Sequence, residues 1–349
     1  MIHYTMRSSS VGKAFGRVNL LGEHLDYNGG YVLPLQINKA VNIKLEHKED
    51  IEGILIRSKS YAEEILVKDC SKKLNNWSDF ILGACDYFNE HYKISIKNIL
   101  ITVDSNLPIG IGLSSSAATC VSMIKALSNL FEIKLDQSTT VKIAHCVEND
   151  FVGVGGGVMD QFVSVYGTTD KALFLNTKNN EYKLISLFDG YSFQIIDSGE
   201  KRILSDSAFN DRKKMCNQSA EKMNLQYLCD KDKIDEEYKI LLSESELKIS
   251  KHVIEENIRS KKGSEALLNN DPKLFGELMT QSHNSLKNDY EVSCEELDKL
   301  VQLCNKYGAM GSKLTGAGFG GAIVTLIKND LVEGLKEYIF KNYSNAKFI

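Results

Sequence analysis

The fold of this chain is decided by the stretch PIGIGLSSSAA, which runs from Pro108 to Ala118. An apolar segment typical of a strand, Ile99–Val103, precedes it, and a helical pattern from about Ser115 to Leu130 follows it. Free amides at the start of a helix bind anions, and the helix dipole favours negative charge, so this glycine–serine loop is suited to phosphate. It lacks the lysine of a Walker A motif, and its glycine spacing is not that of a dinucleotide site. A Gly/Ser linker is the alternative, but the flanking strand and helix favour phosphate binding.

Upstream of this loop, the segment GRVNLLGEHLDYNGG at residues 16–30 concentrates charge in a short turn, which we call the acidic turn. It contains a cation, Arg17, two carboxylates, Glu23 and Asp26, and a histidine, His24. Ionised carboxylates accept hydrogen bonds from hydroxyl groups, so the acidic turn is a candidate surface for binding a sugar. The alternative is a solvated turn with a surface salt bridge.

Two further segments place glycines beside polar side chains. Glu148 ends one predicted helix and Asp160 begins the next, with glycines at 153 and 155–157 between them. Such a pair could hold a metal ion and act on a hydroxyl, or it could be two helix-end charges that interact with helix dipoles. The C-terminal glycine loop, Lys313–Gly321, has four glycines in six positions, which permits close approach of a ligand but equally a plain bend.

Length and composition narrow the class of protein. At 349 residues, with 43% hydrophobic and 25% charged residues, the chain suits two globular domains. A net charge of −4 offers no basic field for nucleic acid or an anionic membrane, and we find no signal peptide or membrane-spanning run. The eight cysteines form no CxxC pair, which predicts reduced, buried thiols in a cytoplasmic protein rather than disulfides or a zinc site.

Mixed helical and strand patterns without strict alternation predict an α+β fold. Strands are expected at Val11–Val18, Tyr31–Leu45, Gly53–Ile56, Ile65–Val67, Ile99–Val103, Ala172–Leu175, Phe193–Ile196, Gly311–Thr315 and Ala322–Ile327. Helices are expected at Trp77–Tyr92, Ser115–Leu130 and Ser138–Phe151, from near Val158, and over most of 203–305, and one more helix and a final short strand are expected after Ile327. We place the domain boundary near residue 190, which gives domains 1–190 and 191–349.

Together these segments resemble the GHMP kinase superfamily and, within it, the galactokinase group. The acidic turn resembles the sugar-binding signature of that group, the glycine–serine loop its phosphate loop, and Lys313–Gly321 its C-terminal loop. Further matches are Phe151–Gly153, Met159–Gln161, Ser282-His283 and Asp289–Cys294. The resemblance implies a two-domain GHMP kinase fold with the active site in the inter-domain cleft. It also implies ATP-dependent phosphorylation of the anomeric C1 hydroxyl of galactose.

The resemblance assigns expected roles to the residues that match the pattern. Asp160 would lie beside the C1 hydroxyl of the sugar, and Arg17 would bridge that hydroxyl and the γ-phosphate of ATP. The expected sugar-contacting residues are Glu23, His24, Asp26, Gly157 and Phe209. The expected ATP-binding residues are Trp77, Phe80, Pro108, Gly110, Gly112, Leu113, Ser114, Ser115 and Ser116. Mg²⁺ would be held by Ser116 and Glu148.

The expected chemistry of Asp160 depends on its neighbour. An arginine beside a carboxyl group lowers its pKa, typically by about 1–3 units. Asp160 would then be a weak base at neutral pH, so we expect it to orient the hydroxyl and to take the proton late. Whether it acts as a true general base stays open.

The sequence departs from the galactokinase pattern at four positions. Phe15 replaces a proline, and Phe80 stands where tyrosine is usual beside adenine, so only stacking is carried over. Gly156 replaces a cysteine next to the sugar, and Phe209 replaces a tyrosine that usually contacts galactose. The last two changes resemble N-acetylgalactosamine kinases, because they add room and remove a hydroxyl. One lost hydrogen bond is worth about 0.5–1.5 kcal/mol, so galactose could still bind.

Other functions remain as alternatives at this stage. A regulatory protein that senses sugar and ATP would share the fold, but the uninterrupted Leu113–Ala118, together with Arg17 and Asp160, favours catalysis. Kinases of mevalonate, homoserine or a heptose phosphate are related, but the acidic turn favours a neutral sugar. Galacturonate is disfavoured, because Glu23 is expected at the C6 hydroxyl and would repel a carboxylate there. We expect a monomer that binds small molecules and neither nucleic acid nor membrane.

Overall fold

The computed structural model describes residues 4–60, 62–200 and 205–349 and divides into two compact units. Unit 1 comprises Met1–Arg17, Gln36–Pro108 and Ser114–Tyr166. Unit 2 comprises Val18–Leu35, Ile109–Leu113 and Gly167–Ile349. This division differs from the predicted boundary near residue 190, because most of the acidic turn groups with the C-terminal part of the chain. The short strand β2 (Tyr31–Val32), which directly follows the acidic turn, pairs with β7 (Lys171–Asn176), and both segments belong to unit 2.

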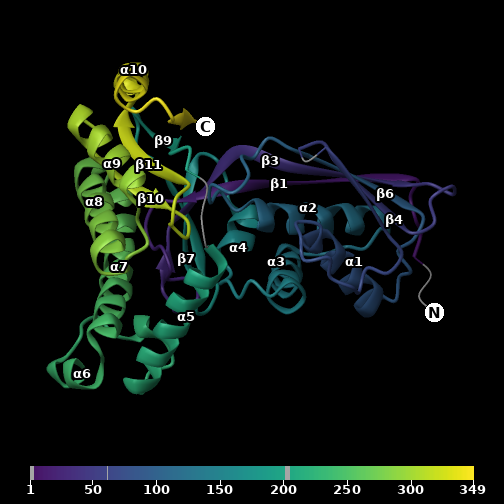
Figure 1. Cartoon of the computed structure of the whole chain (residues 1–349), viewed down its shortest axis with the longest axis horizontal. Coiled ribbons are helices and arrows are strands. Elements are labelled where there is room, and N and C mark those ends of the chain that lie inside the picture. Colours follow the sequence, from purple (N-terminus) through teal and green to yellow (C-terminus); the bar gives the residue numbers. More distant parts are fainter. Residues whose placement is uncertain (1–3, 61, 201–204) are drawn as a thin grey trace. The chain divides into compact units, whose positions relative to one another are not determined.

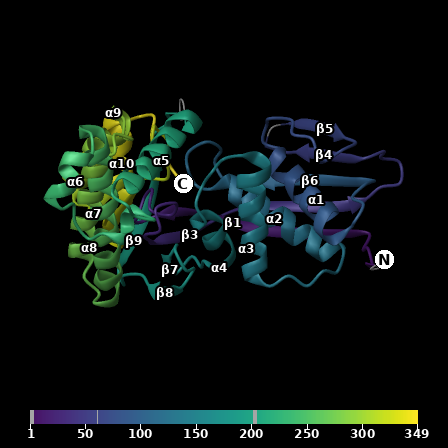
Figure 2. The ribbon, with the colours of Figure 1, turned by 90° about the horizontal axis from the view of Figure 1, so that it is seen from below.

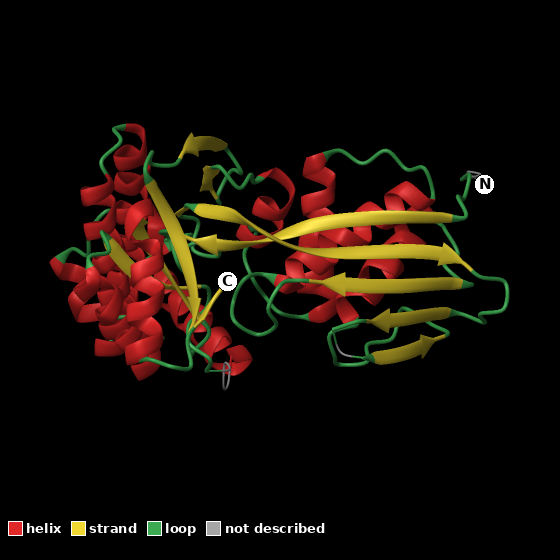
Figure 3. Ribbon diagram, turned by 90° about the horizontal axis from the view of Figure 1, so that it is seen from above, coloured by secondary structure: helices red, strands yellow, loops and turns green. Residues whose placement is uncertain are grey.

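Unit 1 is a five-stranded sheet covered by helices on one face. The strands, in the order β1-β3-β6-β4-β5, are Ser9–Asn19, Pro34–His47, Ile99–Ser105, Ile54–Ser58 and Glu63–Val67. The helices α1 to α4 are Asp79–Tyr92, Ser115–Leu130, Gln137–Cys146 and Met159–Tyr166. Helices α1, α2 and α3 lie against the same face of the sheet (Figures 1 and 2), and Figure 3 shows the strands in front from the other side.

The central helix α2 packs tightly on this sheet because small residues meet at the contact. A Cβ atom on Gly12 of β1 would collide with the backbone carbonyl oxygen of Ser122 in α2. Ala117 and Ala118, in the first turns of α2, are fully buried. This close packing fixes the position of the helix start, where the glycine–serine loop ends.

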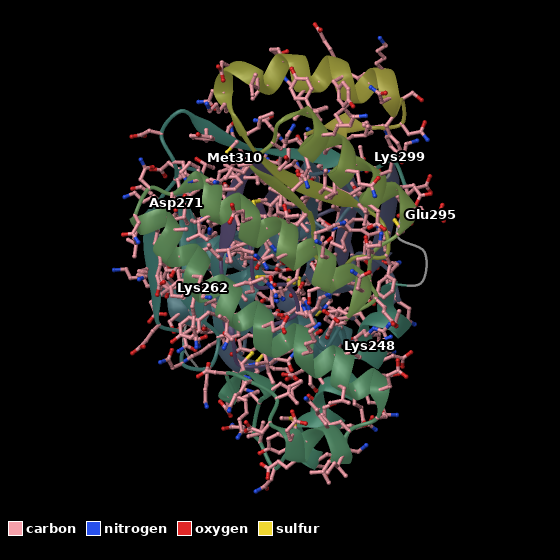
Figure 4. The ribbon with its side chains drawn as sticks, turned by 90° about the vertical axis from the view of Figure 1, so that its left-hand side faces the viewer. Lys248, Lys262, Asp271, Glu295, Lys299 and Met310 are labelled. Carbon is pink, nitrogen blue, oxygen red and sulfur yellow. The ribbon has the colours of Figure 1, made fainter. Side chains whose placement is uncertain are left out.

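Unit 2 combines two antiparallel sheets with a stack of helices. The larger sheet, in the order β10-β11-β9-β12, contains Gly311–Thr315, Ala322–Lys328, Tyr191–Asp197 and Lys347–Phe348. The smaller sheet joins β2 and β7 to β8 (Tyr182–Ser186). The helices α5 to α10 are Ser205–Lys222, Glu236–Leu241, Glu244–Leu268, Pro272–Asn288, Glu295–Tyr307 and Val332–Asn342. Figure 4 shows α7, marked by Lys248 and Lys262, lying beside α8, which starts next to Asp271.

Most predicted elements are present, with three differences. The helix at Ser115–Leu130 and the strand at Gly311–Thr315 are confirmed within their predicted bounds. The predicted strand Tyr31–Leu45 is two strands, because the pairing is interrupted at Leu33, just before Pro34. The predicted helix Ser138–Phe151 is α3 followed by a π-helical turn, Val147–Val152, and β8 was not predicted. In the described part of the chain, every helix is too short or too polar to cross a lipid bilayer.

Candidate active site

The structure brings Arg17 and Asp160 together in unit 1, although they are 143 positions apart. Arg17 lies near the end of β1, and Asp160 lies in the first turn of α4. The Arg17 guanidinium donates from Nε to Oδ1 of Asp160 at 2.8 Å, and its Nη2 lies 2.7 Å from the same oxygen. The Arg17 side chain is 6% exposed and that of Asp160 is 26% exposed. The aspartate therefore keeps part of its surface open to a ligand while its charge is balanced.

A second carboxylate, Glu148, is buried close to this pair. It lies in the π-helical turn and is 6% exposed. The Ser116 hydroxyl donates to its carboxylate, and so does the side-chain amide of Gln161. Burial raises the pKa of Glu148 to about 8, repulsion by Asp160 adds to this, and Ser116 and Arg17 oppose it. If both carboxylates were ionised, Arg17 would be their shared counter-charge, so Glu148 tends to keep its proton, and a bound cation would favour its ionised form.

The glycine–serine loop has the geometry of an anion cradle. Gly110, Gly112 and Ser114 adopt left-handed backbone angles, with φ of 77°, 86° and 60°. Helix α2 begins at Ser115, and the Ser114 side chain caps none of its amides. Among the described residues, the buried Ser114 hydroxyl is one of the few side-chain groups without a hydrogen-bond partner. The free amides of the first turn and this hydroxyl remain available for an anion.

The two aromatic residues expected near adenine lie at the start of α1. The Trp77 indole Nε1–H donates to Oε2 of Glu63 at 3.1 Å, just before the helix. Phe80 follows in the first turn and, like Trp77, is half-buried. Both side chains therefore keep exposed surface, and their role with a nucleotide stays a prediction.

In unit 2, the acidic turn is tied to the C-terminal glycine loop by a buried ion pair. Lys313 Nζ lies 2.5 Å from Oε2 of Glu23, and the Gly316 amide donates to Oε1 at 3.3 Å. Lys313 is fully buried and Glu23 is 2% exposed. Both carboxylate oxygens of Glu23 thus have protein partners, which the sequence did not reveal. The sequence disfavoured galacturonate because Glu23 was expected to repel its carboxylate. Since Lys313 neutralises the charge of Glu23, this repulsion is weaker than the sequence suggested.

A third buried carboxylate, Glu256 of α7, anchors the backbone of the acidic turn. Its Oε1 accepts from the Gly22 amide at 2.8 Å and from the Ser282 hydroxyl at 2.7 Å. Its Oε2 accepts from Nε of Arg259 at 2.7 Å. Burial alone would raise the pKa of Glu256, but the charges of Arg259, His252 and Lys313 lower it to about 2. Glu256 was not predicted, since it lies 234 positions from the amide that it holds.

His24 lies at the centre of an aromatic cluster in unit 2. Its backbone is left-handed, with φ of 65°, a conformation that most side chains avoid. Its ring centroid lies 4.6 Å from that of Tyr290 and 5.9 Å from that of Phe209. Phe209, expected to replace a sugar-contacting tyrosine, therefore packs against a residue of the sugar-binding signature. Asp26 follows in the same turn and is half-buried.

The glycines before Asp160 leave open space in unit 1. A Cβ atom on Gly156 would meet no other atom within 4 Å. Gly157 is half-buried and lies three positions before Asp160 in the sequence. Among the described residues, no group of three or more His, Cys, Asp or Glu side chains is arranged to hold a metal ion. A cation at Glu148 would therefore take other oxygen ligands.

Comparison with known sequences identifies these features as a family pattern. Residues 3–45 match the galactokinase galactose-binding signature, residues 79–168 the GHMP kinases N terminal domain and residues 264–345 the GHMP kinases C terminal domain. The galactokinase of Thermotoga maritima is 39% identical over 334 residues, covering 95% of this chain and 93% of the relative. The chain belongs to the galactokinase family of GHMP kinases.

Other members and structures of the superfamily agree with this assignment. The galactokinase of Clostridium perfringens is 36% identical over 344 residues, covering 95% of this chain and 89% of the relative. The crystal structure of Lactococcus lactis galactokinase complexed with galactose superposes with a TM-score of 0.90 at 28% identity, covering 99% of this chain and 93% of that one. The Methanococcus jannaschii mevalonate kinase, at 21% identity and a TM-score of 0.73, shares the fold. The predicted two-domain GHMP kinase fold of mixed helices and strands is confirmed.

Proposed function

We propose that this galactokinase-family chain transfers the γ-phosphoryl group of ATP to the C1 hydroxyl of galactose, which yields galactose 1-phosphate and ADP. The observation that carries the proposal is the Arg17–Asp160 pair, in which the carboxylate keeps 26% of its side-chain surface exposed. Family membership and the likeness to a galactokinase complexed with galactose support galactose as the sugar.

In the proposed reaction, the oxygen at C1 forms a bond to the γ-phosphorus while the bond to the leaving oxygen of ADP breaks. Such transfers depend on in-line positioning and on neutralising the charge of the phosphoryl oxygens. Asp160 accepts a hydrogen bond from the C1 hydroxyl and takes its proton late. Arg17 stabilises the charge that builds up between the sugar oxygen and the γ-phosphate.

The remaining predicted residues would bind the two substrates. The sugar would be bound by Glu23, His24, Asp26, Gly157 and Phe209. The nucleotide would be bound by Pro108, Gly110, Gly112, Leu113, Ser114, Ser115 and Ser116, with Trp77 and Phe80 beside the adenine. The unpartnered Ser114 hydroxyl and the free amides of α2 support the phosphate part of this assignment.

We propose Ser116 and Glu148 as the residues that hold Mg²⁺. A hydroxyl and a carboxylate are the hard oxygen ligands that Mg²⁺ prefers, and it commonly takes one or two carboxylates together with substrate phosphates. The deficit of positive charge around Glu148 fits a cation at this position. When bound, Mg²⁺ would neutralise phosphate charge. We further propose a cytoplasmic monomer, in line with the free thiol of every cysteine.

N-acetylgalactosamine is a second candidate substrate. The space beside Gly156 and the missing hydroxyl at Phe209 favour a larger substituent at C2. A steady-state assay of ADP release with MgATP and both sugars separates the candidates. We expect galactose to be phosphorylated, with measurable turnover of N-acetylgalactosamine. Turnover of galactose without any turnover of the acetamido sugar removes the second candidate, and turnover of neither contradicts both.

A further inference from the structure

A chain of hydrogen bonds runs from His24 into the interior of unit 2. His24 Nδ1 lies 2.8 Å from the hydroxyl of Tyr27, and this hydroxyl lies 2.9 Å from that of Tyr290. The Tyr290 hydroxyl lies 3.2 Å from Sγ of Cys216 in α5. Tyr27 and Tyr290 are 263 positions apart, so this chain is a product of the fold.

The inner end of this series of hydrogen bonds, at Tyr290 and Cys216, is closed to water. Tyr290 and Cys216 are fully buried. The Tyr290 ring lies between two histidine rings, with centroid distances of 4.6 Å to His24 and 4.6 Å to His252. Burial raises the pKa of the Cys216 thiol to about 11, so it stays protonated at neutral pH. Buried polar groups are rarely left unpaired, so these three hydrogen bonds are expected to persist in the folded protein.

Asn28 links the two ends of this series of hydrogen bonds. Its side-chain amide donates to the carbonyl oxygen of His24 at 2.7 Å and also hydrogen-bonds to the Cys216 thiol. With an amide N–H donating to sulfur, the thiol hydrogen is free to donate to the Tyr290 hydroxyl. In that arrangement Tyr290 donates to Tyr27, and Tyr27 donates to Nδ1 of His24.

We infer that Tyr27 and Tyr290 are positioning residues that hold His24 as the tautomer protonated at Nε2. A neutral imidazole has one donor and one acceptor nitrogen, so an Nδ1 that accepts from Tyr27 requires a hydrogen on Nε2. His24 then presents an N–H donor, oriented by the ring contacts with Tyr290. Its use as a donor to a sugar hydroxyl rests on the proposed function.

Two isosteric variants of the full-length enzyme test whether loss of these hydroxyl groups weakens galactose binding. Tyr27→Phe and Tyr290→Phe keep the rings and remove one hydroxyl each. We expect each to raise the KM for galactose about 2- to 10-fold, with Tyr27→Phe the stronger, since one hydrogen bond is worth roughly that factor. The KM for ATP should stay unchanged. Tyr343→Phe is the matched control, because it removes a hydroxyl that donates to the Ser198 carbonyl oxygen at 2.9 Å elsewhere in unit 2.

Nitrogen-15 NMR of the histidine rings reads the tautomer directly. The chain has seven histidines, and a His24→Gln variant identifies the His24 signals. We expect a protonated Nε2 and an unprotonated Nδ1 in the wild type, and a mixed or shifted tautomer in Tyr27→Phe. A protonated Nδ1 in the wild type overturns the inference, as do unchanged KM values and tautomers in both variants. If the wild type does not phosphorylate galactose, the proposed function fails, while the NMR result still decides the tautomer.

Discussion

Unit 1 and unit 2 differ in how their buried carboxylates are paired with cations. In unit 1, Arg17 is the cation that acts on both Glu148 and Asp160, and burial raises the pKa of Glu148. In unit 2, Glu23 has its own partner in Lys313, and the pKa of Glu256 is lowered by its neighbours. We therefore expect a ligand to complete the cluster of unit 1, whereas the protein itself supplies the counter-charge of Glu23 in the acidic turn.

The two units therefore obtain their specificity in different ways. A cluster with missing positive charge favours a cation, and a bound cation would in turn neutralise phosphate oxygens, as phosphoryl transfer requires. A turn whose buried glutamate is already neutralised by Lys313 is held in place by the protein, which suits the recognition of a neutral sugar. Substitutions at the buried carboxylates of the two units should then differ in kind, since those at Asp160 and Glu148 are expected to change catalysis and those at the Glu23–Lys313 pair are expected to change mainly stability.

The largest effect is expected for Asp160→Asn. The amide keeps the shape but neither pairs with Arg17 as an anion nor accepts the proton of the sugar. We expect kcat to fall by about 10²- to 10⁴-fold, the usual contribution of a positioned proton acceptor. Rapid-quench measurement of sugar phosphate formation checks this, with the melting temperature as a control for folding. Near-normal turnover in a folded variant contradicts the role of Asp160.

Lys313→Met should act mainly on stability. Removing this cation leaves the Glu23 carboxylate buried without its partner, which costs about 3–5 kcal/mol in the free energy of unfolding. The double variant Lys313→Met with Glu23→Gln should recover part of the loss, because no charge then remains unpaired. Urea unfolding of the three variants and the wild type measures this coupling. Independent, additive effects of the two substitutions speak against the ion pair.

Glu148→Gln, in contrast to Lys313→Met, should change the Mg²⁺ requirement and not the stability. With a pKa of about 8, most Glu148 is protonated at pH 7, so an uncharged amide replaces it without a stability penalty in the absence of Mg²⁺. We expect an unchanged or higher melting temperature without Mg²⁺. The Mg²⁺ concentration for half-maximal activity should rise by about 10-fold or more, since one charged oxygen ligand is lost. A variant with an unaltered Mg²⁺ requirement excludes Glu148 as a ligand.

The last prediction concerns the pH dependence of the unfolding free energy, which arises from two buried histidines of unit 2. Burial lowers the pKa values of His252 and His283 to about 4 each. Below the unfolded value near 6.5, the unfolded chain binds protons that the folded chain does not, so stability is present above that pH and is lost as the pH falls toward 4. Each histidine contributes a slope of at most about 1.4 kcal/mol per pH unit.

His252→Gln serves as the test of this slope. Its unfolding free energy, measured by urea titration between pH 4 and 7, should depend less on pH than that of the wild type. Equal slopes for the two proteins show that His252 is protonated in the folded state, which contradicts a closed interior around Tyr290.

The local features of the site could be predicted from the sequence. The pattern at residues 108–130 specifies a loop followed by a helix, and the family resemblance places Arg17 beside Asp160, as observed. The long-range partners could not be predicted. Lys313 lies 290 positions from Glu23, and no periodicity links the two. Strand β8 was missed because only Ile185 of its residues is buried, so it lacks the alternation of a half-buried strand.

The most direct test of the account is the identity of the product. The wild-type chain, incubated with MgATP and galactose, should give one new sugar phosphate whose phosphorus couples in NMR to the proton at C1, together with an equal amount of ADP. Asp160→Asn should give almost none. A phosphate on C6, or ADP formed without any sugar phosphate, would contradict the placement of the Arg17–Asp160 pair at the anomeric hydroxyl.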